Sequence, residues 1–541
     1  MPPDGTIGEL DERQQAFDER RAETREKVIE KVGWPLDAWA VAATLESFGL
    51  RDVDAEEQFG SGSIFHLAET IYDEISNAPS EPTTLKAMES LTPWARLKSF
   101  IVYYCKGTLF AMPMATQIAA VLILRYSLWA WLDFSNLEAT LVALGTIASF
   151  IVTGGFIQAI GREGTFYTGQ KNWKLLEEVC RLIILTGTGL MLAVVLGFCV
   201  FNLFVPVLAW RYAVVSLTYF VLLSPMWLFL GVLFMLQDNF AIVLTTTVGT
   251  VAVHLMMTYT SYGIYAAHWI GLAVTNVVAC GYGAFRIRKR RKELEKRFEK
   301  SLLPRSSVLL YIVLPFLVYG VLYFTFLNAD RIIGWSAARG YLPLVIWFRT
   351  PYELGMDWAL LSLVFTIAVL EYSVNEFSRT IIPVQEATKA ADYKAHNRHY
   401  QRFYNRQRIM LAVVAVISVT ITYFGVRSLE QYDHIKEVRD FFASPITYEV
   451  FWYAAISYSL LALGLLNSLF FFSLARPNVV VACIWPALVT NVVVGYVASR
   501  MISFEYSVLG LLAGSVVFAA LTSRRASKLF RTLDFYYYSA F

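Results

Sequence analysis

Charged residues are scarce in this sequence. Asp, Glu, Lys and Arg together make up 16% of its 541 residues, whereas hydrophobic residues make up 56% and aromatic residues 15%. Soluble globular proteins typically carry about 25% charged residues, and the mean hydropathy of this chain is +0.49. The composition therefore excludes an ordinary soluble enzyme and indicates a protein whose solvent is largely lipid.

Motifs for metal, redox or nucleotide chemistry are also missing. The five cysteines form no C-x-x-C pair and have no His at ligand spacing, so the sequence predicts neither a disulfide framework nor a metal site. No Walker A string is present, which argues against ATP-driven transport by this chain alone. The only D-x-D string, Asp52-Val53-Asp54, follows no strand-like run, and we interpret it as a solvated turn. We expect no cofactor, no bound metal and no enzymatic activity.

Apolar length is what the sequence has in abundance. About twelve stretches, each close to the ~20 residues needed to cross a bilayer, follow one another from residue 107 to residue 521. They predict an all-α polytopic membrane protein. The predicted spans are 107–131, 137–160, 179–204, 207–236, 240–260, 262–285, 308–327, 358–377, 410–426, 449–474, 479–498 and 504–521.

The distribution of Lys and Arg predicts the orientation of these spans. Basic residues are concentrated in the loops after the second, sixth, eighth and twelfth spans, and the opposite loops carry fewer. Because Lys and Arg mark the cytoplasmic side, both termini are predicted to be cytoplasmic. The first 95 residues are polar and contain no signal-peptide-like run, which agrees with this orientation. We expect a multi-pass protein of the plasma (inner) membrane.

Four parts are predicted along the chain. Residues 1–95 have the composition of a small helical cytoplasmic domain, which is either a simple cap or, over residues 1–84, a docking place for a cytoplasmic synthase. Residues 96–285 hold spans one to six. The basic stretch 286–305 is a cytoplasmic linker that either sets topology or binds anionic lipid headgroups. Residues 306–541 hold spans seven to twelve and a cytoplasmic tail.

Ionisable groups inside spans are the candidates for function, because each is costly in hydrocarbon unless it faces a partner or water. Arg125 is predicted to lie within the first span, where its guanidinium either contacts an anionic cargo in a cavity or snorkels to the outer interface. Glu371 is predicted to lie deep in the eighth span, where it either couples a proton or cation or pairs with a cavity arginine.

Two histidines extend this set of candidates. His254 and His268 are predicted to lie in the fifth and sixth spans, and their imidazoles titrate near neutral pH when unperturbed. Each is either a proton-coupling group or a hydrogen-bonding contact to a neighbouring helix.

Asp330 and Arg331 are adjacent at the outer end of the seventh span, where they can lie at a cargo vestibule. The string Asn-Ala-Asp-Arg-Ile-Ile-Gly that contains them, just after a basic mid-chain linker, resembles polysaccharide flippases of the multidrug/oligosaccharidyl-lipid/polysaccharide (MOP) superfamily. The turn 348–352 resembles, within that superfamily, the exporters of Pel-type exopolysaccharide systems. The resemblance implies two six-helix lobes (MATE/Wzx-like) around a V-shaped cavity with alternating access, and it does not include the N-terminal ninety-odd residues.

These observations predict a membrane transporter that exports a lipid-linked oligosaccharide or an exopolysaccharide. Arg125, Asp330, Arg331 and Glu371 are the predicted cavity residues, with Glu371, His254 and His268 as candidates for proton coupling. An ion-coupled multidrug or small-molecule antiporter of the same superfamily is the alternative. Antiporters of this kind commonly use a buried acid in the first lobe. In this sequence the first-lobe acids Glu138 and Asp238 lie near span ends, and the first span carries Arg125 instead. A membrane scaffold or a membrane-embedded transferase is the alternative from another class.

Overall fold

The computed structural model describes residues 5–32, 35, 37–77, 93–109, 112–294, 305–337, 344–387, 393–430 and 444–533. Three basic residues of the predicted outer loops, Arg339, Lys436 and Arg439, lie outside these ranges, as do residues 295–304 of the predicted linker and the tail after residue 533. The chain divides into two compact units. The first comprises Met1–Val102, Ser373–Gln407 and Ser527–Phe541, and the second comprises Tyr103–Tyr372 and Arg408–Ala526.

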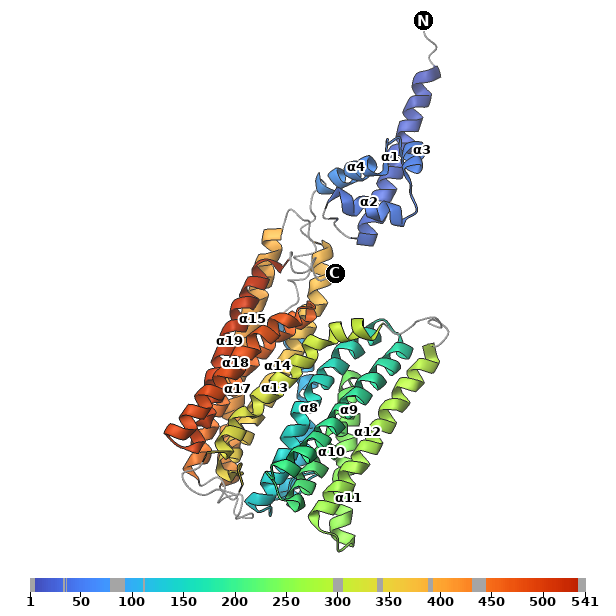
Figure 1. Ribbon diagram of the computed structural model, residues 1–541. Coiled ribbons are helices and arrows are strands. Elements are labelled where there is room, and N and C mark those ends of the chain that lie inside the picture. The colour runs from blue at the N-terminus through green and yellow to red at the C-terminus, as the bar shows by residue number, and fades with distance from the viewer. Residues whose placement is uncertain are drawn as a thin grey trace. The chain divides into compact units, whose positions relative to one another are not determined.

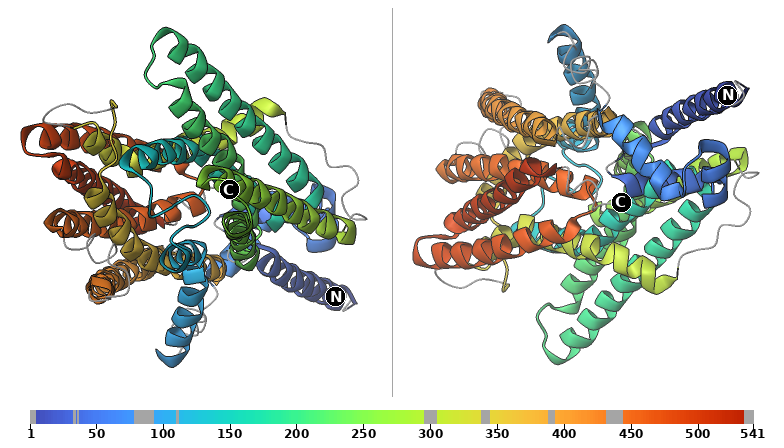
Figure 2. Two further views of the ribbon diagram at one scale, coloured as in Figure 1. Left: turned by 90° about the horizontal axis from the view of Figure 1, so that it is seen from below. Right: turned by 90° about the horizontal axis from the view of Figure 1, so that it is seen from above.

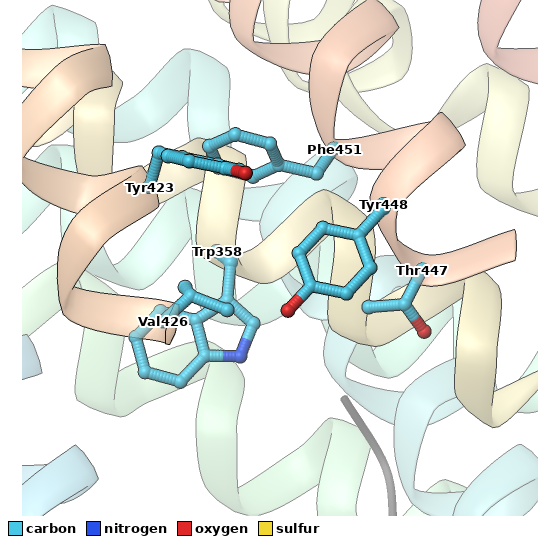
Figure 3. Close-up of a pocket in the computed structure, with 6 residues that line it drawn as sticks. All are labelled: Trp358, Tyr423, Val426, Thr447, Tyr448 and Phe451. Atoms are coloured by element: carbon cyan, nitrogen blue, oxygen red, sulfur yellow. The ribbon is translucent and has the colours of Figure 1, made fainter. Parts of the chain in front are cut away.

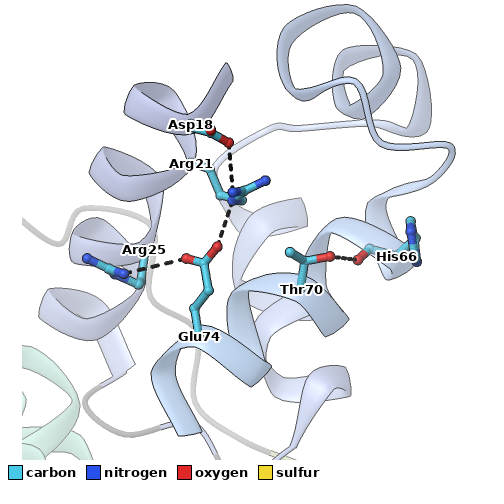
Figure 4. Close-up of polar contacts among 6 residues, drawn as sticks. All are labelled: Asp18, Arg21, Arg25, His66, Thr70 and Glu74. Atoms are coloured by element: carbon cyan, nitrogen blue, oxygen red, sulfur yellow. Dashed lines mark hydrogen bonds and ion pairs between the residues drawn. The ribbon is translucent and has the colours of Figure 1, made fainter. Parts of the chain in front are cut away.

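The beginning of the first unit is a group of four helices, α1 (Gly5–Val32), α2 (Ala38–Ser47), α3 (Asp52–Phe59) and α4 (Ile64–Asn77). Their apolar faces share one core, to which α4 contributes Leu67, Ala68 and Ile71. An ion-pair contact joins α4 to α1, since Glu74 lies 2.7 Å from Arg21 (Figure 4). Elsewhere the first unit contains the ends of longer apolar helices.

The D-x-D string is not a turn, as the sequence suggested. Asp52 and Asp54 lie in the first turn of α3, where the Asp54 carboxylate accepts a hydrogen bond of 2.9 Å from the backbone N–H of Arg51. Asp52 accepts a second one, 2.8 Å long, from the N–H of Ile64. Acidic side chains are favourable at a helix N-terminus because they satisfy its free N–H groups. Both carboxylates therefore have structural partners.

The apolar helices confirm the predicted all-α membrane architecture. Among the described residues, eleven helices are long and apolar enough to cross a membrane, and the bent pair 97–108 and 112–124 can be counted as a twelfth span. The first six spans form the N-lobe, made of α6 (Pro93–Thr108), α7 (Met112–Leu124), α8 (Asn136–Gly169), α9 (Trp173–Phe204), α10 (Trp210–Met235), α11 (Asn239–Tyr259) and α12 (Ile264–Leu294).

The last six spans form the C-lobe. It contains α13 (Ser306–Trp335), α14 (Thr350–Ala387), α15 (Tyr393–Glu430), α17 (Pro445–Ser473), α18 (Pro477–Met501), the short 3-10 helix η4 (Phe504–Ser507) and α19 (Val508–Arg531). Figure 2 shows α8 to α12 in teal to green and the C-lobe helices in yellow to red, while α6 and α7 are blue.

Within the second unit, the lobes meet along α8 and α13, which lie side by side (Figure 1). The contact depends on glycines, which have no side chain to separate the two helices. A Cβ at Gly155 would lie 2.5 Å from the carbonyl oxygen of Leu317, and one at Gly320 would overlap the backbone of Gly154. A second close approach joins α6 to α14, where a Cβ at Gly107 would lie 2.7 Å from the carbonyl oxygen of Ala368. The two lobes are therefore in backbone contact.

The first span ends earlier than the sequence predicted. Its last helix, α7, stops at Leu124, and residues 125–135 form a hairpin before α8 begins at Asn136. Arg125 adopts φ = +70°, a left-handed conformation that ends a helix, and an isolated β-bridge joins Tyr126 to Trp131. Hydropathy alone could not separate this apolar hairpin from the helix that precedes it.

Candidate functional site

The C-lobe contains a cluster of charged side chains in the helical segments of α13 and α14. Arg331 forms ion pairs with two carboxylates of α14, Glu353 and Asp357, the latter 2.8 Å away. Asp330 is completely buried and accepts a hydrogen bond of 2.6 Å from the hydroxyl of Tyr352. We call the five residues Asp330, Arg331, Tyr352, Glu353 and Asp357 the C-lobe charge cluster.

Helical spacing brings this cluster together. Arg331 and Trp335 are four residues apart on α13, so both side chains lie on one face of the helix. Glu353 and Asp357 have the same spacing on α14. The Trp335 indole N–H donates a hydrogen bond of 2.7 Å to Glu353, whose carboxylate therefore receives bonds from both residues of the α13 face.

The charges of the cluster do not balance. Three carboxyl groups, those of Asp330, Glu353 and Asp357, accompany the single guanidinium of Arg331. The Oδ1 atom of Asp330 is buried and has no hydrogen-bond partner among the described residues. A buried carboxylate is costly without a paired charge. The cluster therefore holds more carboxyl groups than cations, and in the described part of the chain no three His, Cys, Asp or Glu side chains are placed to hold a metal ion.

Two of the four predicted cavity residues belong to this cluster. Asp330 and Arg331 are adjacent in the chain, but each bonds a residue of α14: Asp330 accepts a hydrogen bond from Tyr352, and Arg331 forms an ion pair with Glu353. Glu371 is also on α14, fourteen residues beyond Asp357. At a rise of 1.5 Å per residue this separation is ~21 Å along the helix. Glu371 is half-buried and lies at a different depth from the cluster.

Arg125 lies in the N-lobe hairpin rather than within a span. Its guanidinium forms an ion pair of 2.7 Å with Asp133, and both side chains are 45% exposed. The structure therefore corrects its predicted position, because the helix ends one residue before it. The ion pair closes the base of the hairpin.

The two histidines lie in the N-lobe, each beside a tyrosine. The hydroxyl of Tyr126 is 2.8 Å from Nδ1 of His254, and the hydroxyl of Tyr219 is 2.7 Å from Nδ1 of His268. An ordinary phenol has a pKa of ~10 and is protonated at neutral pH, so Tyr126 can donate to His254. His268 is completely buried. Both imidazoles thus contact a tyrosine from a different part of the lobe, His254 one in the hairpin and His268 one on α10.

Comparison of the fold with solved structures identifies its type. The chain is similar to an outward-facing multidrug resistance MATE family transporter of the MOP superfamily, with a TM-score of 0.51 and 12% identity over 81% of this chain and 97% of that chain. The fold is that of the MATE transporters. No protein-family model matches the sequence, and no curated protein matches it.

Two further MATE-fold structures support this result. A mutant of the Vibrio cholerae MATE transporter VcmN has a TM-score of 0.53 and 12% identity, covering 84% of this chain and 100% of that chain. A MOP superfamily transporter from Pyrococcus furiosus, described as having a binding pocket of reversed polarity, has a TM-score of 0.53 and 12% identity, covering 81% and 97%. At this identity the likeness shows the fold alone, so the polysaccharide-export branch and the Pel-type exporter stay predictions.

Sequence reasoning missed the acids that the MATE fold buries in this chain. Glu353 precedes the predicted start of span eight, but α14 begins at Thr350, and it is 4% exposed. The dipeptide Thr350-Pro351 was the available signal, because Pro favours the first turn of a helix. Glu163 follows the predicted end of span two, but α8 continues to Gly169 and buries it to 3% exposure. The N-lobe therefore does contain a buried acid.

The C-lobe also contains a small aromatic pocket between α14, α15 and α17 (Figure 3). Arg427, at the rim, lies 5.3 Å from the ring centre of Tyr448. The pocket has no carboxylate in its lining, which consists of Trp358, Tyr423, Val426, Thr447, Tyr448 and Phe451. It is an apolar recess, and its Trp358 directly follows Asp357 of the charge cluster on α14.

Proposed function

We propose that this protein is a membrane transporter that exports a saccharide or a lipid-linked saccharide by alternating access of its two lobes. The observation that carries the proposal is the MATE fold, with two six-helix lobes in contact along α8 and α13. The solved structures that share this fold are transporters by description. Repeats of this kind can rock against one another around a cargo site.

The contacts between the lobes are consistent with reversible opening. Near the start of α8, the hydroxyl of Thr350 donates to the amide oxygen of Asn136 over 3.1 Å, and the N–H of Phe348 donates to the hydroxyl of Thr140 over 3.0 Å. Each of these neutral hydrogen bonds contributes about 0.5–1.5 kcal/mol. A differential affinity for cargo of a few kcal/mol is enough to shift such an equilibrium.

The N-lobe supports the choice of cargo. Its histidines and tyrosines are hydrogen-bonding groups, and aromatic rings surround them. Hydrogen-bonding groups beside aromatic rings suit the hydroxyls and apolar faces of sugars. The cargo class, and the cavity roles of Arg125, Asp330, Arg331 and Glu371, belong to this proposal.

The test measures surface and intracellular saccharide in cells that carry Glu353→Gln, Arg331→Met, Arg125→Ala or Glu371→Gln, each at a normal level in the membrane. Drug susceptibility is measured in the same strains. Glu293→Gln, an exposed acid on α12, is the control. Saccharide lost from the surface and retained inside, with unchanged drug susceptibility, is the expected result. Unchanged saccharide in all four variants would refute it.

The ion-coupled antiporter has its own supporting observation. The excess of carboxyl groups in the C-lobe charge cluster, together with the buried Glu163, provides groups that can bind and release protons. An antiporter would show raised drug susceptibility in Glu353→Gln and Glu163→Gln cells, with saccharide unaffected. The two outcomes are therefore separable in one experiment.

The N-terminal helices and the orientation complete the proposal. We place both termini in the cytoplasm of a cell bounded by a plasma (inner) membrane, with residues 1–84 as the docking place of a synthase. The excess of Lys and Arg in the loops on that side supports the orientation. Deleting residues 1–84 should leave the spans folded and abolish export, and export that survives the deletion would remove the docking role.

A further inference from the structure

The hairpin at residues 125–135 does not lie on the surface of the N-lobe but folds into it. Leu128, near its tip, is completely buried, and Ser127 beside it is 2% exposed. The fold of the hairpin is fixed by its backbone: the N–H of Leu132 donates to the carbonyl of Arg125 over 2.9 Å. An outer loop of this length would ordinarily run over the surface.

The Leu128 side chain fits into a notch between α11 and α12. Its Cδ1 atom would be 2.8 Å from a Cβ at Gly249 and 3.2 Å from a Cβ at Gly271. The closer constraint on both glycines is the packing of α11 against α12, because a Cβ at Gly249 would overlap Oγ1 of Thr275 and one at Gly271 would lie 2.8 Å from the carbonyl oxygen of Gly249. The leucine therefore lies where the two helices approach each other closely.

A single side chain holds the tip of the hairpin by its backbone. The amide oxygen of Gln117 accepts a hydrogen bond of 3.0 Å from the N–H of Leu128. The amide nitrogen of Gln117 donates over 3.1 Å to the hydroxyl of Thr250 on α11. Gln117 is 8% exposed, so this link between the hairpin and the lobe is shielded from water.

Aromatic rings make the remaining contacts. Trp129 lies edge-on to Trp227 with ring centres 5.7 Å apart, and Phe134 lies 5.9 Å from both His268 and Tyr265. Arg125 and Asp133 pair with each other at the base of the hairpin. The surface covered by the hairpin is mostly polar and aromatic, and its Tyr265 donates a hydrogen bond of 3.1 Å to the Glu138 carboxylate.

Phe134 of the hairpin lies against His268, and Trp269 stacks on the neighbouring Tyr265. Nε2 of His268 and Nε1 of Trp269 are buried, and neither has a hydrogen-bond partner in the described part of the chain. A buried polar atom without a partner costs about 1–3 kcal/mol. If the hairpin were a permanent part of the lobe, we would expect it to form hydrogen bonds with these two atoms, and it does not. A ligand with several hydroxyl groups could form them.

We propose that the N-lobe has a binding site for a neutral, hydroxyl-rich ligand, and that the hairpin 125–135 occupies this site until the ligand displaces it. The inference rests on the proposed function, in which a saccharide is the cargo. Gln117, Thr250, His254 and His268 supply hydrogen bonds to such a ligand, and Trp227 and Tyr265 supply ring faces. The hairpin keeps the lobe filled when no cargo is present.

The experiment measures how fast a thiol at the hairpin tip reacts. Leu128→Cys is introduced into full-length protein in lipid nanodiscs, with Cys105, Cys199 and Cys280 replaced by Ser, because these three are not buried. Val345→Cys, at a position 70% exposed, is the reference for an accessible thiol. We expect Leu128→Cys to react with a polar maleimide at least tenfold more slowly than Val345→Cys. Equal rates would show that the hairpin is not seated and would overturn the proposal.

Displacement is tested in the same background. Gln117→Ala should raise the reaction rate at Leu128→Cys about tenfold, and Thr186→Ala, an exposed hydroxyl on α9, should leave it unchanged. Neutral hexasaccharides of glucose or N-acetylglucosamine should raise it severalfold, and a hexagalacturonate should not. No response to either neutral hexasaccharide would overturn the ligand class.

Hydrogen exchange of the unsubstituted protein gives a second measurement, because Leu128→Cys itself alters the tip. The amides of residues 125–135 should be protected without ligand and should lose protection with the neutral hexasaccharides. These measurements need no transport. If saccharide displaces the hairpin but the protein exports no saccharide in cells, the binding site stands and the proposed export function is wrong. If the protein exports saccharide while the hairpin stays protected, the export function stands and the proposed site is wrong.

Discussion

Arg331 is the residue on which the C-lobe charge cluster depends. Its side chain is 13% exposed, that of Glu353 is 5% exposed, and Glu353 has no other cationic partner among the described ion pairs. Removing one member of a buried ion pair is strongly destabilising, because the other charge remains buried. Asp357 is different, since its side chain is 58% exposed and water can replace the arginine.

Replacing Arg331 should therefore destabilise the protein. We expect Arg331→Met to cost about 3–5 kcal/mol, measured as a lowered midpoint of thermal unfolding in detergent. Asp357→Asn should have a small effect. The double variant Arg331→Met/Glu353→Gln should recover much of the loss, because the uncompensated carboxylate is then absent. A double variant as unstable as Arg331→Met alone would show that packing, and not charge, accounts for the effect.

Among the elements, α8 combines the most constraints. It packs against α9 and α10 within the N-lobe and against α13 of the C-lobe. The face toward α13 carries Gly155, where a Cβ would meet the carbonyl of Leu317, while Gly161 of the same helix has open space around its Cβ position. Gly155 is therefore required by helix packing, whereas packing does not require a glycine at Gly161.

The pair allows a matched comparison. Gly155→Ala should cost about 1–3 kcal/mol, since the helices must move apart to admit the methyl group. Gly161→Ala should be neutral or stabilise by up to about 1 kcal/mol, because alanine favours the helix. Thermal unfolding of both variants in one detergent checks the prediction, and a loss of the same size at Gly161 would contradict the structural reason.

The start of α3 should be pH-dependent. The hydrogen bond from the Arg51 side chain, at 3.2 Å, lowers the pKa of Asp54 below its ordinary value. A carboxylate whose pKa is lower in the folded state stabilises the fold above its unfolded pKa, ~3.9, and the contribution is lost as the pH falls through the folded value. Amide exchange in residues 52–59 should thus be slower in the wild type than in Asp54→Asn at pH 6, and the difference should shrink as the pH is lowered below ~3.9. A difference that does not change with pH would contradict the assignment.

At the scale of the whole transmembrane part, the proposed alternating access requires the contacts between the lobes near the starts of α8 and α14 to open. Asn136→Cys and Thr350→Cys place thiols at the ends of α8 and α14 that the native hydrogen bond joins. A short bifunctional thiol reagent should cross-link them and abolish transport, and a cleavable reagent should restore it on reduction. The pair Asn136→Cys/Gly189→Cys, with Gly189 on the open face of α9, is the control for modification alone. Transport that continues through the cross-link would rule out opening at this point.

The sequence predicted the number of spans and the all-α class because each span is long and apolar, and hydropathy measures that directly. Its errors lie at span ends. Hydropathy extended the first span through the hairpin and ended the second before Glu163, because an apolar hairpin resembles a helix and a charged helical turn resembles a loop. Asp330 and Arg331 could be found as charges inside an apolar run. Their partners on α14 could not, because a contact over twenty residues depends on how two helices pack.

The contact between α8 and α13 predicts which glycine positions can be substituted in homologues of this protein. Every single-nucleotide change in a glycine codon that alters the amino acid introduces a Cβ atom. At Gly155 and Gly320 that atom would collide with backbone, which no change of rotamer can relieve. Homologues that keep this contact are therefore expected to keep glycine at both positions, while Gly161, Gly189 and Gly197, which have open space around them, are free to drift.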